Sequence, residues 1–99
     1  YFVCVVPGAA EVDLKKAAKA SGNKKCDLIP LKDLLPLTGY IRGGCSPIGM
    51  KKHFPTYIHE SVAKHEKIYV SAGQRGLQIQ ITPNDLIKET QAALADLII

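Results

Sequence analysis

The sequence predicts an α+β domain built on a mixed β-sheet. β-branched and aromatic side chains fill residues 1–6, and apolar and polar side chains alternate over residues 77–82, as they do in strands. Residues 13–22 and 82–98 instead carry apolar side chains at helical spacing. These segments follow one another without a strict strand–helix–strand rhythm, and 99 residues suit one domain. We therefore expect strands of both orientations, flanked by helices.

The first half of the chain predicts a strand, a helix and a loop-rich stretch. A Pro-Gly pair ends the strand over residues 1–6. Asp13 opens the helix and Gly22 closes it. Residues 26–29 favour a further short strand, and residues 32–35 favour one helical turn before the next proline. The apolar face of the helix is expected to consist of Leu14, Ala17, Ala18 and Ser21.

The second half predicts a β-hairpin and a final helix. Residues 56–59 and 67–70 have strand composition. The short connection 71–76 would join residues 67–70 to the strand over residues 77–82. That strand should bury one face, made of Leu77, Ile79 and Ile81. A threonine cap and a proline at the first position then predict a helix that continues to Ile98.

The distribution of charge points to an anionic partner. Thirteen Lys and Arg against nine Asp and Glu give a mild net charge of +4. No acidic residue lies between Asp33 and Glu60, although that stretch contains several cationic ones. Nucleic acid is the obvious candidate, and a solvated surface that lacks acids is the alternative. The candidate phosphate contacts are Arg42, Lys51 and Lys52.

Composition excludes several other classes of protein. The three cysteines are odd in number and form no CxxC, which argues against a disulfide framework or a zinc site and fits a reducing cytoplasm. No apolar run is long enough to span a bilayer, so we expect no membrane partner. With no Trp, an open base-stacking platform is disfavoured. Because the chain starts inside a strand pattern, we expect a segment upstream of it.

The stretch from Gly39 to Gly49 is the leading candidate for a working surface. It contains four glycines and one proline in eleven residues. Glycine allows close approach of a ligand to the backbone, and successive N–H groups can bind an anion or a carbonyl oxygen. In ester hydrolysis they could stabilise the oxyanion. A tight chain reversal is the alternative, and the spacing around Ser46 fits neither a phosphate-binding loop nor a nucleophile elbow.

Three other features offer weaker chemistry. Two His-Glu pairs begin at His59 and His65, but six residues separate the histidines where a helical metal site needs four. We interpret both pairs as exposed and expect no metal. Cys45 has no base beside it in the sequence, which favours a small buried thiol over a nucleophile. Residues 71–76 are either a simple turn or a loop that presents Ser71 and Arg75 to a phosphate or ribose.

These two loops, in this order, resemble the YbaK family of aminoacyl-tRNA editing domains, and within it the free-standing Cys-tRNA(Pro) deacylases. The resemblance implies hydrolysis of the ester that holds a wrong, small amino acid on the 3′ end of tRNA, without a metal or organic cofactor. It implies tRNA as partner, and prolyl-tRNA synthetase as a second one. It also implies a single editing-type domain over residues 1–99, with a partly barrel-like sheet and a missing N-terminal segment. The matching blocks are VVPG, DLKK, TGYIRGGCSPIGMKK, PTYIHES and IYVSAGQRGLQIQITPNDL.

The resemblance further implies roles for individual residues. The family's Gly-x-x-x-Pro loop matches residues 43–47, and its Ser-x-Gly turn matches residues 71–73. Backbone amides and the substrate's own hydroxyl or thiol would do the chemistry, not a protein nucleophile. The catalytic candidates are Gly43, Gly44 and Ser71, and the substrate-binding candidates are Cys45, Ser46, Pro47, Gly49, Gly73, Arg75 and Gly76.

Three departures from the family pattern keep a second hypothesis open. The chain contains no Lys-Thr pair, which in the family supplies a functional lysine upstream of the first block. Cys45 stands where relatives usually carry an aliphatic residue, and Gln78 stands where some carry an acid. The alternative to an enzyme is therefore a non-catalytic module that binds tRNA or a synthetase.

Overall fold

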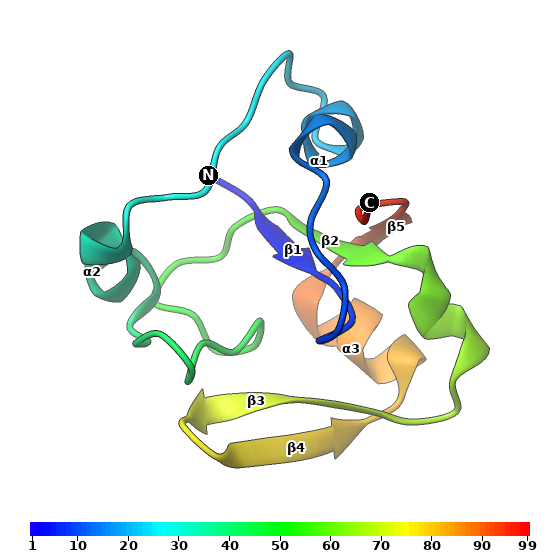
Figure 1. Cartoon of the computed structure of the whole chain (residues 1–99). Helices are drawn as coiled ribbons and strands as arrows, with labels where there is room; N and C mark the ends of the chain where they lie inside the picture. Colours follow the sequence, from blue (N-terminus) through cyan, green and yellow to red (C-terminus); the bar gives the residue numbers. More distant parts are fainter.

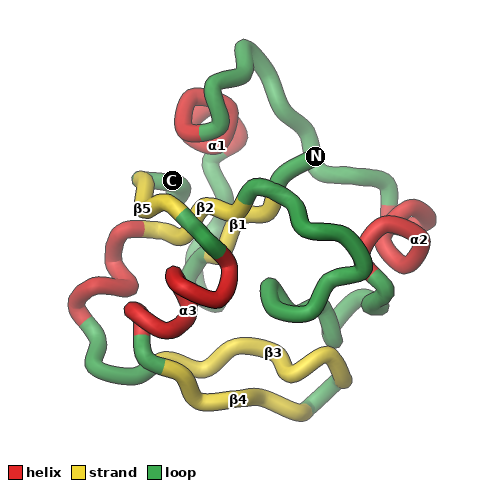
Figure 2. The backbone as a smooth tube through the Cα atoms, turned by 180° about the vertical axis from the view of Figure 1, so that it is seen from behind, coloured by secondary structure: helices red, strands yellow, loops and turns green.

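The computed structural model describes residues 1–99, which form two small sheets with a helix between them (Figure 1). Three parallel strands lie in the order β1-β2-β5, and β3 pairs with β4 in an antiparallel hairpin. Seen from behind, α3 again lies between the parallel strands and the hairpin (Figure 2). The α+β class is confirmed, with the parallel and antiparallel strands in separate sheets. The strands are β1 (Val3–Val5), β2 (Thr56–His59), β3 (Ile68–Gln74), β4 (Leu77–Ile81) and β5 (Ala93–Ala95).

The first helix begins where its capping residue places it. In α1 (Leu14–Ala20), the Asp13 carboxylate accepts from the first free backbone amides, and Ala17 and Ala18 are buried, as predicted. The 3₁₀ turn η1 (Leu31–Asp33) leads directly into α2 (Leu34–Thr38). The predicted stop before Pro36 is wrong, because a proline in the first helical turn displaces no intrahelical hydrogen bond. No helix of the structure combines the length and apolar character needed to cross a bilayer.

Three other sequence predictions are wrong. The helix α3 (Pro83–Thr90) starts at its threonine cap but does not reach Ile98, because Gln91 turns left-handed at φ +54° and the chain then pairs with β2. Residues 26–29 form no strand. The predicted buried face of β4 is largely open, with Leu77 52% and Ile79 38% exposed. The hairpin instead contacts the core mainly through β3, where Val70 is buried.

One apolar cluster fastens the hairpin to the parallel sheet. Leu86 of α3 is fully buried and packs with Ile58 of β2 and Val70 of β3. Val62 of the 3₁₀ helix η2 (Glu60–Lys64) completes the cluster. Each member comes from a different element, so this core sets how the hairpin lies relative to the sheet.

The C-terminal segment is fastened by polar contacts. His59, expected to be exposed, is only 7% exposed, and its Nδ1 accepts a hydrogen bond from the Leu97 amide at 3.2 Å. Lys16 donates to the Ile98 carbonyl at 2.8 Å and forms an ion pair with Asp96 at 2.9 Å. The His59 imidazole therefore satisfies a buried amide, which the sequence pattern did not reveal.

The Lys16–Asp96 pair predicts a loss of stability in acid. The hydrogen bond from Lys16 holds the pKa of Asp96 below its usual value. Because the folded protein favours the ionised carboxylate, this group adds to the free energy of unfolding at neutral pH. That contribution is lost as the pH falls below about 4 and the carboxylate is protonated. Thermal unfolding from pH 6 to pH 2 should show a smaller acid-induced drop in Tm for Asp96→Asn than for the wild type. Equal drops in the two proteins would contradict the contribution of this pair.

Candidate active site

The two glycine-containing loops singled out in the sequence contact each other. The loop between α2 and β2 lies over the tip of the β3–β4 hairpin (Figure 1). The Nε of Arg75, at the hairpin tip, donates to the Arg42 carbonyl at 2.9 Å. A Cβ at Gly44 would lie 3.1 Å from the Arg75 amide nitrogen. Residues 42–44 therefore rest directly on the backbone of the hairpin turn.

Glycine is required at Gly43 and Gly44 for two different reasons. Gly43 has a φ of +83°, a left-handed conformation that side chains disfavour. Gly44 is buried with ordinary backbone angles, but its Cβ would also meet Gln74 backbone atoms at 3.2 and 3.3 Å. The first glycine lets the loop turn, and the second lets it approach the hairpin.

The backbone amides of this loop are unequally available. The Gly44 N–H donates to the Ile41 carbonyl at 3.0 Å, so it is satisfied inside the loop. The N–H groups of Gly43, Cys45 and Ser46 have no acceptor within the protein. A carbonyl or oxyanion oxygen could accept from these free amides. The sequence indicated the amides of Gly43 and Gly44, but the Gly44 amide is already used within the loop, whereas those of Cys45 and Ser46 are free.

The two serines in the loops share one local arrangement. The Ser71 Oγ accepts from the Gly73 amide at 3.3 Å, and the Ser46 Oγ accepts from the Ile48 amide at 3.2 Å. Neither hydroxyl is hydrogen-bonded to a histidine or a carboxylate. Without a base to remove its proton, a serine hydroxyl is a weak nucleophile. Both serines hold their own turns, and Ser71 does so at a β-bulge where the register of β3 shifts.

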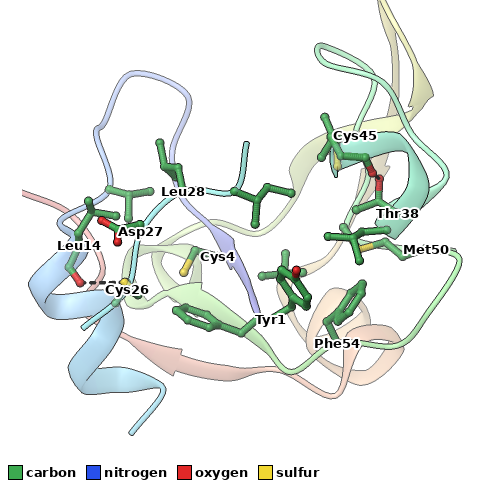
Figure 3. Close-up of a pocket in the computed structure, with 17 residues that line it drawn as sticks. Tyr1, Cys4, Leu14, Cys26, Asp27, Leu28, Thr38, Cys45, Met50 and Phe54 are labelled. Atoms are coloured by element: carbon green, nitrogen blue, oxygen red, sulfur yellow. Dashed lines mark hydrogen bonds between the residues drawn. The ribbon is translucent and has the colours of Figure 1, made fainter. Parts of the chain in front are cut away.

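Cys45 contacts a cavity on the side away from the hairpin. This mostly apolar cavity of about 280 Å³ lies among β1, α1, α2 and residues 26–29 (Figure 3). Cys4 and Cys26 also line it, whereas Ser71 and Gly73 do not. Burial raises the pKa of the Cys45 thiol, which keeps it protonated at neutral pH. The sequence favoured a buried thiol; the Cys45 thiol is half-buried, and it is not an activated nucleophile.

The remaining candidates lie on the loop between α2 and β2 and at the hairpin turn. Arg42, Lys51 and Lys52 are exposed, as phosphate contacts must be. Pro47, Gly49 and Lys52 line a small, more polar cavity of about 90 Å³ against the end of α3. Gly76 adopts φ +76° at the hairpin turn, with no atom near its Cβ position.

Tyr40 belongs to the site although the sequence analysis passed over it. Its hydroxyl donates to the Ile48 carbonyl at 2.6 Å. Its ring lies against Gly73, where a Cβ would be 2.8 Å from Cε1, and its hydroxyl would be 3.0 Å from a Cβ at Gly49. In the sequence Tyr40 is an aromatic residue inside the first loop, and nothing there specifies its contact with Gly73, 33 residues away.

Comparisons with known proteins identify the family of this chain. The model of the aminoacyl-tRNA editing domain matches residues 1–89. EbsC of Enterococcus faecalis, a candidate Cys-tRNA(Pro)/Cys-tRNA(Cys) deacylase, is 56% identical over 95 residues, a match that covers 96% of this chain and 58% of EbsC. The chain thus spans less than two thirds of that relative's length.

Solved structures share the fold over nearly the whole chain. A candidate trans-editing enzyme for prolyl-tRNA synthetase superposes with a TM-score of 0.81 at 28% identity, covering 93% of this chain and 58% of that one. A structure from work on epitope grafting onto scaffold proteins gives a TM-score of 0.88 at 27% identity, covering 97% and 63%. Since the family model covers nearly the full length and both family loops meet in the fold, the chain belongs to the aminoacyl-tRNA editing domain family.

Proposed function

We propose that this chain hydrolyses the ester of mischarged tRNA and that Cys-tRNA(Pro) is its substrate. The observation that carries the proposal is the direct contact between residues 42–44 and the Gln74–Arg75 turn. This contact brings the loop with the unpaired amides against the end of β3, the strand that carries Ser71. EbsC, the relative named for Cys-tRNA deacylation, supports the choice of amino acid and tRNA.

The proposed chemistry relies on the backbone rather than on a side-chain nucleophile. A water oxygen attacks the ester carbonyl, and the carbonyl oxygen becomes an oxyanion. The free N–H groups of Gly43, Cys45 and Ser46 donate to that oxyanion. The intermediate then collapses, and the C–O bond to the terminal ribose breaks. The ribose oxygen takes up the proton that the attacking water gives up, and a free amino acid and an intact tRNA are released.

The tRNA is proposed to follow the exposed basic side chains around the loop. Arg42, Lys51 and Lys52 lie on the loop itself. Arg75 donates from its Nε to the Arg42 carbonyl, which brings its guanidinium to the junction of the two loops. A guanidinium at this junction suits a phosphate of the tRNA acceptor end. Prolyl-tRNA synthetase as a further partner, and the cytoplasm as location, follow from this proposal.

Deacylation of mischarged tRNA tests the proposed activity directly. Cys-tRNA(Pro), labelled in the amino acid, should lose its label faster with the full-length wild-type protein than in buffer. Correctly charged Pro-tRNA(Pro) is the control and should remain charged. No release above background from Cys-tRNA(Pro) would overturn the enzymatic proposal. Binding without turnover would instead favour the non-catalytic module.

Salt dependence tests the proposed tRNA contacts. Removing the charges of Arg42, Lys51 and Lys52 together should weaken tRNA binding, because each phosphate contact releases counterions. The slope of log K against log salt should become shallower by about 2 to 3. The control replaces Lys15 and Lys19, exposed lysines on α1, and should leave the slope unchanged. Equal slopes for the wild type and the loop variant would place the tRNA elsewhere.

A further inference from the structure

We propose that Tyr40 is a positioning residue that holds the Gly43–Pro47 loop and the Ser71–Gly73 turn in their reactive arrangement. The inference rests on the proposed function and adds a residue to it. Tyr40 is half-buried and contacts both loops through a single side chain. It touches neither the unpaired amides nor the Ser71 hydroxyl through a hydrogen bond, so it would act through the loops.

The first loop is fixed to Tyr40 at both of its ends. The Tyr40 amide donates to the Thr38 Oγ1 at 3.1 Å, and that hydroxyl donates to the Leu34 carbonyl at 2.7 Å within α2. The Tyr40 hydroxyl donates to the Ile48 carbonyl at 2.6 Å. Residues 41–47, which carry the unpaired amides, are therefore a closed loop that Tyr40 ties to the end of α2.

The second loop rests on the edge of the Tyr40 ring. A Cβ at Gly73 would meet Cε1 at 2.8 Å, Cδ1 at 3.5 Å and Cζ at 3.6 Å. The Gly73 amide in turn donates to the Ser71 Oγ. The strand bulges here, with Ser71 opposite Gln78 but Gln74 opposite Leu77, so this segment lacks the regular ladder that would fix it. The Tyr40 ring therefore supports the segment around Gly73, which regular strand pairing does not hold.

Few other contacts hold the two loops together. The Arg75 hydrogen bond to the Arg42 carbonyl is exposed, and the Gly44 contact is a close approach without a hydrogen bond to the hairpin. Both contacts are made by Gln74 and Arg75, so neither of them holds residues 71–73 directly. A displacement of one ångström between reacting groups costs about 100-fold in rate. Loss of the ring should therefore reduce turnover more than it reduces tRNA binding.

The test compares Tyr40→Phe, Tyr40→Ala and the control Tyr69→Ala. Tyr69 lies on β3 with 64% of its surface exposed, and its only side-chain hydrogen bond comes from Gln80. Deacylation kcat should fall about 5-fold for Tyr40→Phe and about 50-fold or more for Tyr40→Ala, with KM within twofold. Tyr69→Ala should keep both constants. Wild-type kcat in Tyr40→Phe, or a loss that appears in KM alone, would overturn the inference.

Amide hydrogen exchange separates this inference from the proposed function. Tyr40→Ala should speed exchange in residues 41–49 and 71–76, whereas Tyr69→Ala should speed neither. Gly73→Ala should also speed exchange in residues 71–76, because its Cβ would displace the ring and its φ of +95° disfavours a side chain. A wild-type protein without deacylase activity would sink the proposed function, whereas unchanged exchange in Tyr40→Ala would sink the role of Tyr40.

Discussion

Gly44→Val is expected to lower kcat for deacylation by about 100-fold or more, because it forces the two loops of the site apart. The Cβ would lie 3.1 Å from the Arg75 amide nitrogen and 3.2 Å from the Gln74 carbonyl carbon. Both are backbone atoms of a hairpin turn, which cannot rotate out of the way as a side chain can. Gly44 has no positive φ, so valine adds steric bulk without backbone strain of its own.

A graded series tests this steric explanation. Gly44→Ala should reduce kcat less than Gly44→Val, because a methyl group needs a shift of only a few tenths of an ångström. Gly8→Val is the control, since Gly8 is exposed and no atom lies within 4 Å of its Cβ position. Deacylation is measured at saturating substrate, and circular dichroism checks that each variant folds. Wild-type kcat in a folded Gly44→Val would show that the contact between the loops does not matter for catalysis.

Local sequence signals predicted the element starts well. The strand over residues 56–59 has the predicted bounds, and Asp13 and Thr82 cap their helices as expected. Each of these features depends on neighbours within a few residues, which a sequence displays directly. The end of α3 depends instead on pairing between β5 and β2, more than thirty residues away. Helical spacing beyond Thr90 therefore gave a false continuation.

The candidate site was predictable as two loops but not as one surface. The glycines marked both loops, yet the sequence could not distinguish a glycine that turns the chain, such as Gly43, from one that admits a neighbour, such as Gly44. Nor could it assign Tyr40 to Gly73, because that contact arises from how the hairpin lies on the core. Alternation in β4 likewise predicted a buried face without showing what would cover Leu77 and Ile79.

Leu86→Ala should lower the free energy of unfolding by about 2–5 kcal/mol, the usual cost of removing a fully buried leucine side chain. Leu86 is 0% exposed and packs with Ile58, Val62 and Val70, so the cavity would lie between the parallel sheet and the hairpin. The matched control is Leu35→Ala on α2, where the leucine is 53% exposed and the change should stay within about 0.5 kcal/mol. Urea unfolding followed by circular dichroism measures both variants.

The same variant tests whether the core positions the site. Val70 directly precedes Ser71 on β3, so a cavity beside Val70 loosens the strand that presents the turn. We expect kcat per folded molecule to fall for Leu86→Ala and to stay at the wild-type value for Leu35→Ala. If Leu86→Ala were destabilised but kept full kcat, the contacts of Tyr40 and Gly44 with the hairpin would suffice to hold the site. If Leu86→Ala lowered both the free energy of unfolding and kcat, the packing of α3 would set the distance between the two loops, although α3 carries no candidate site residue.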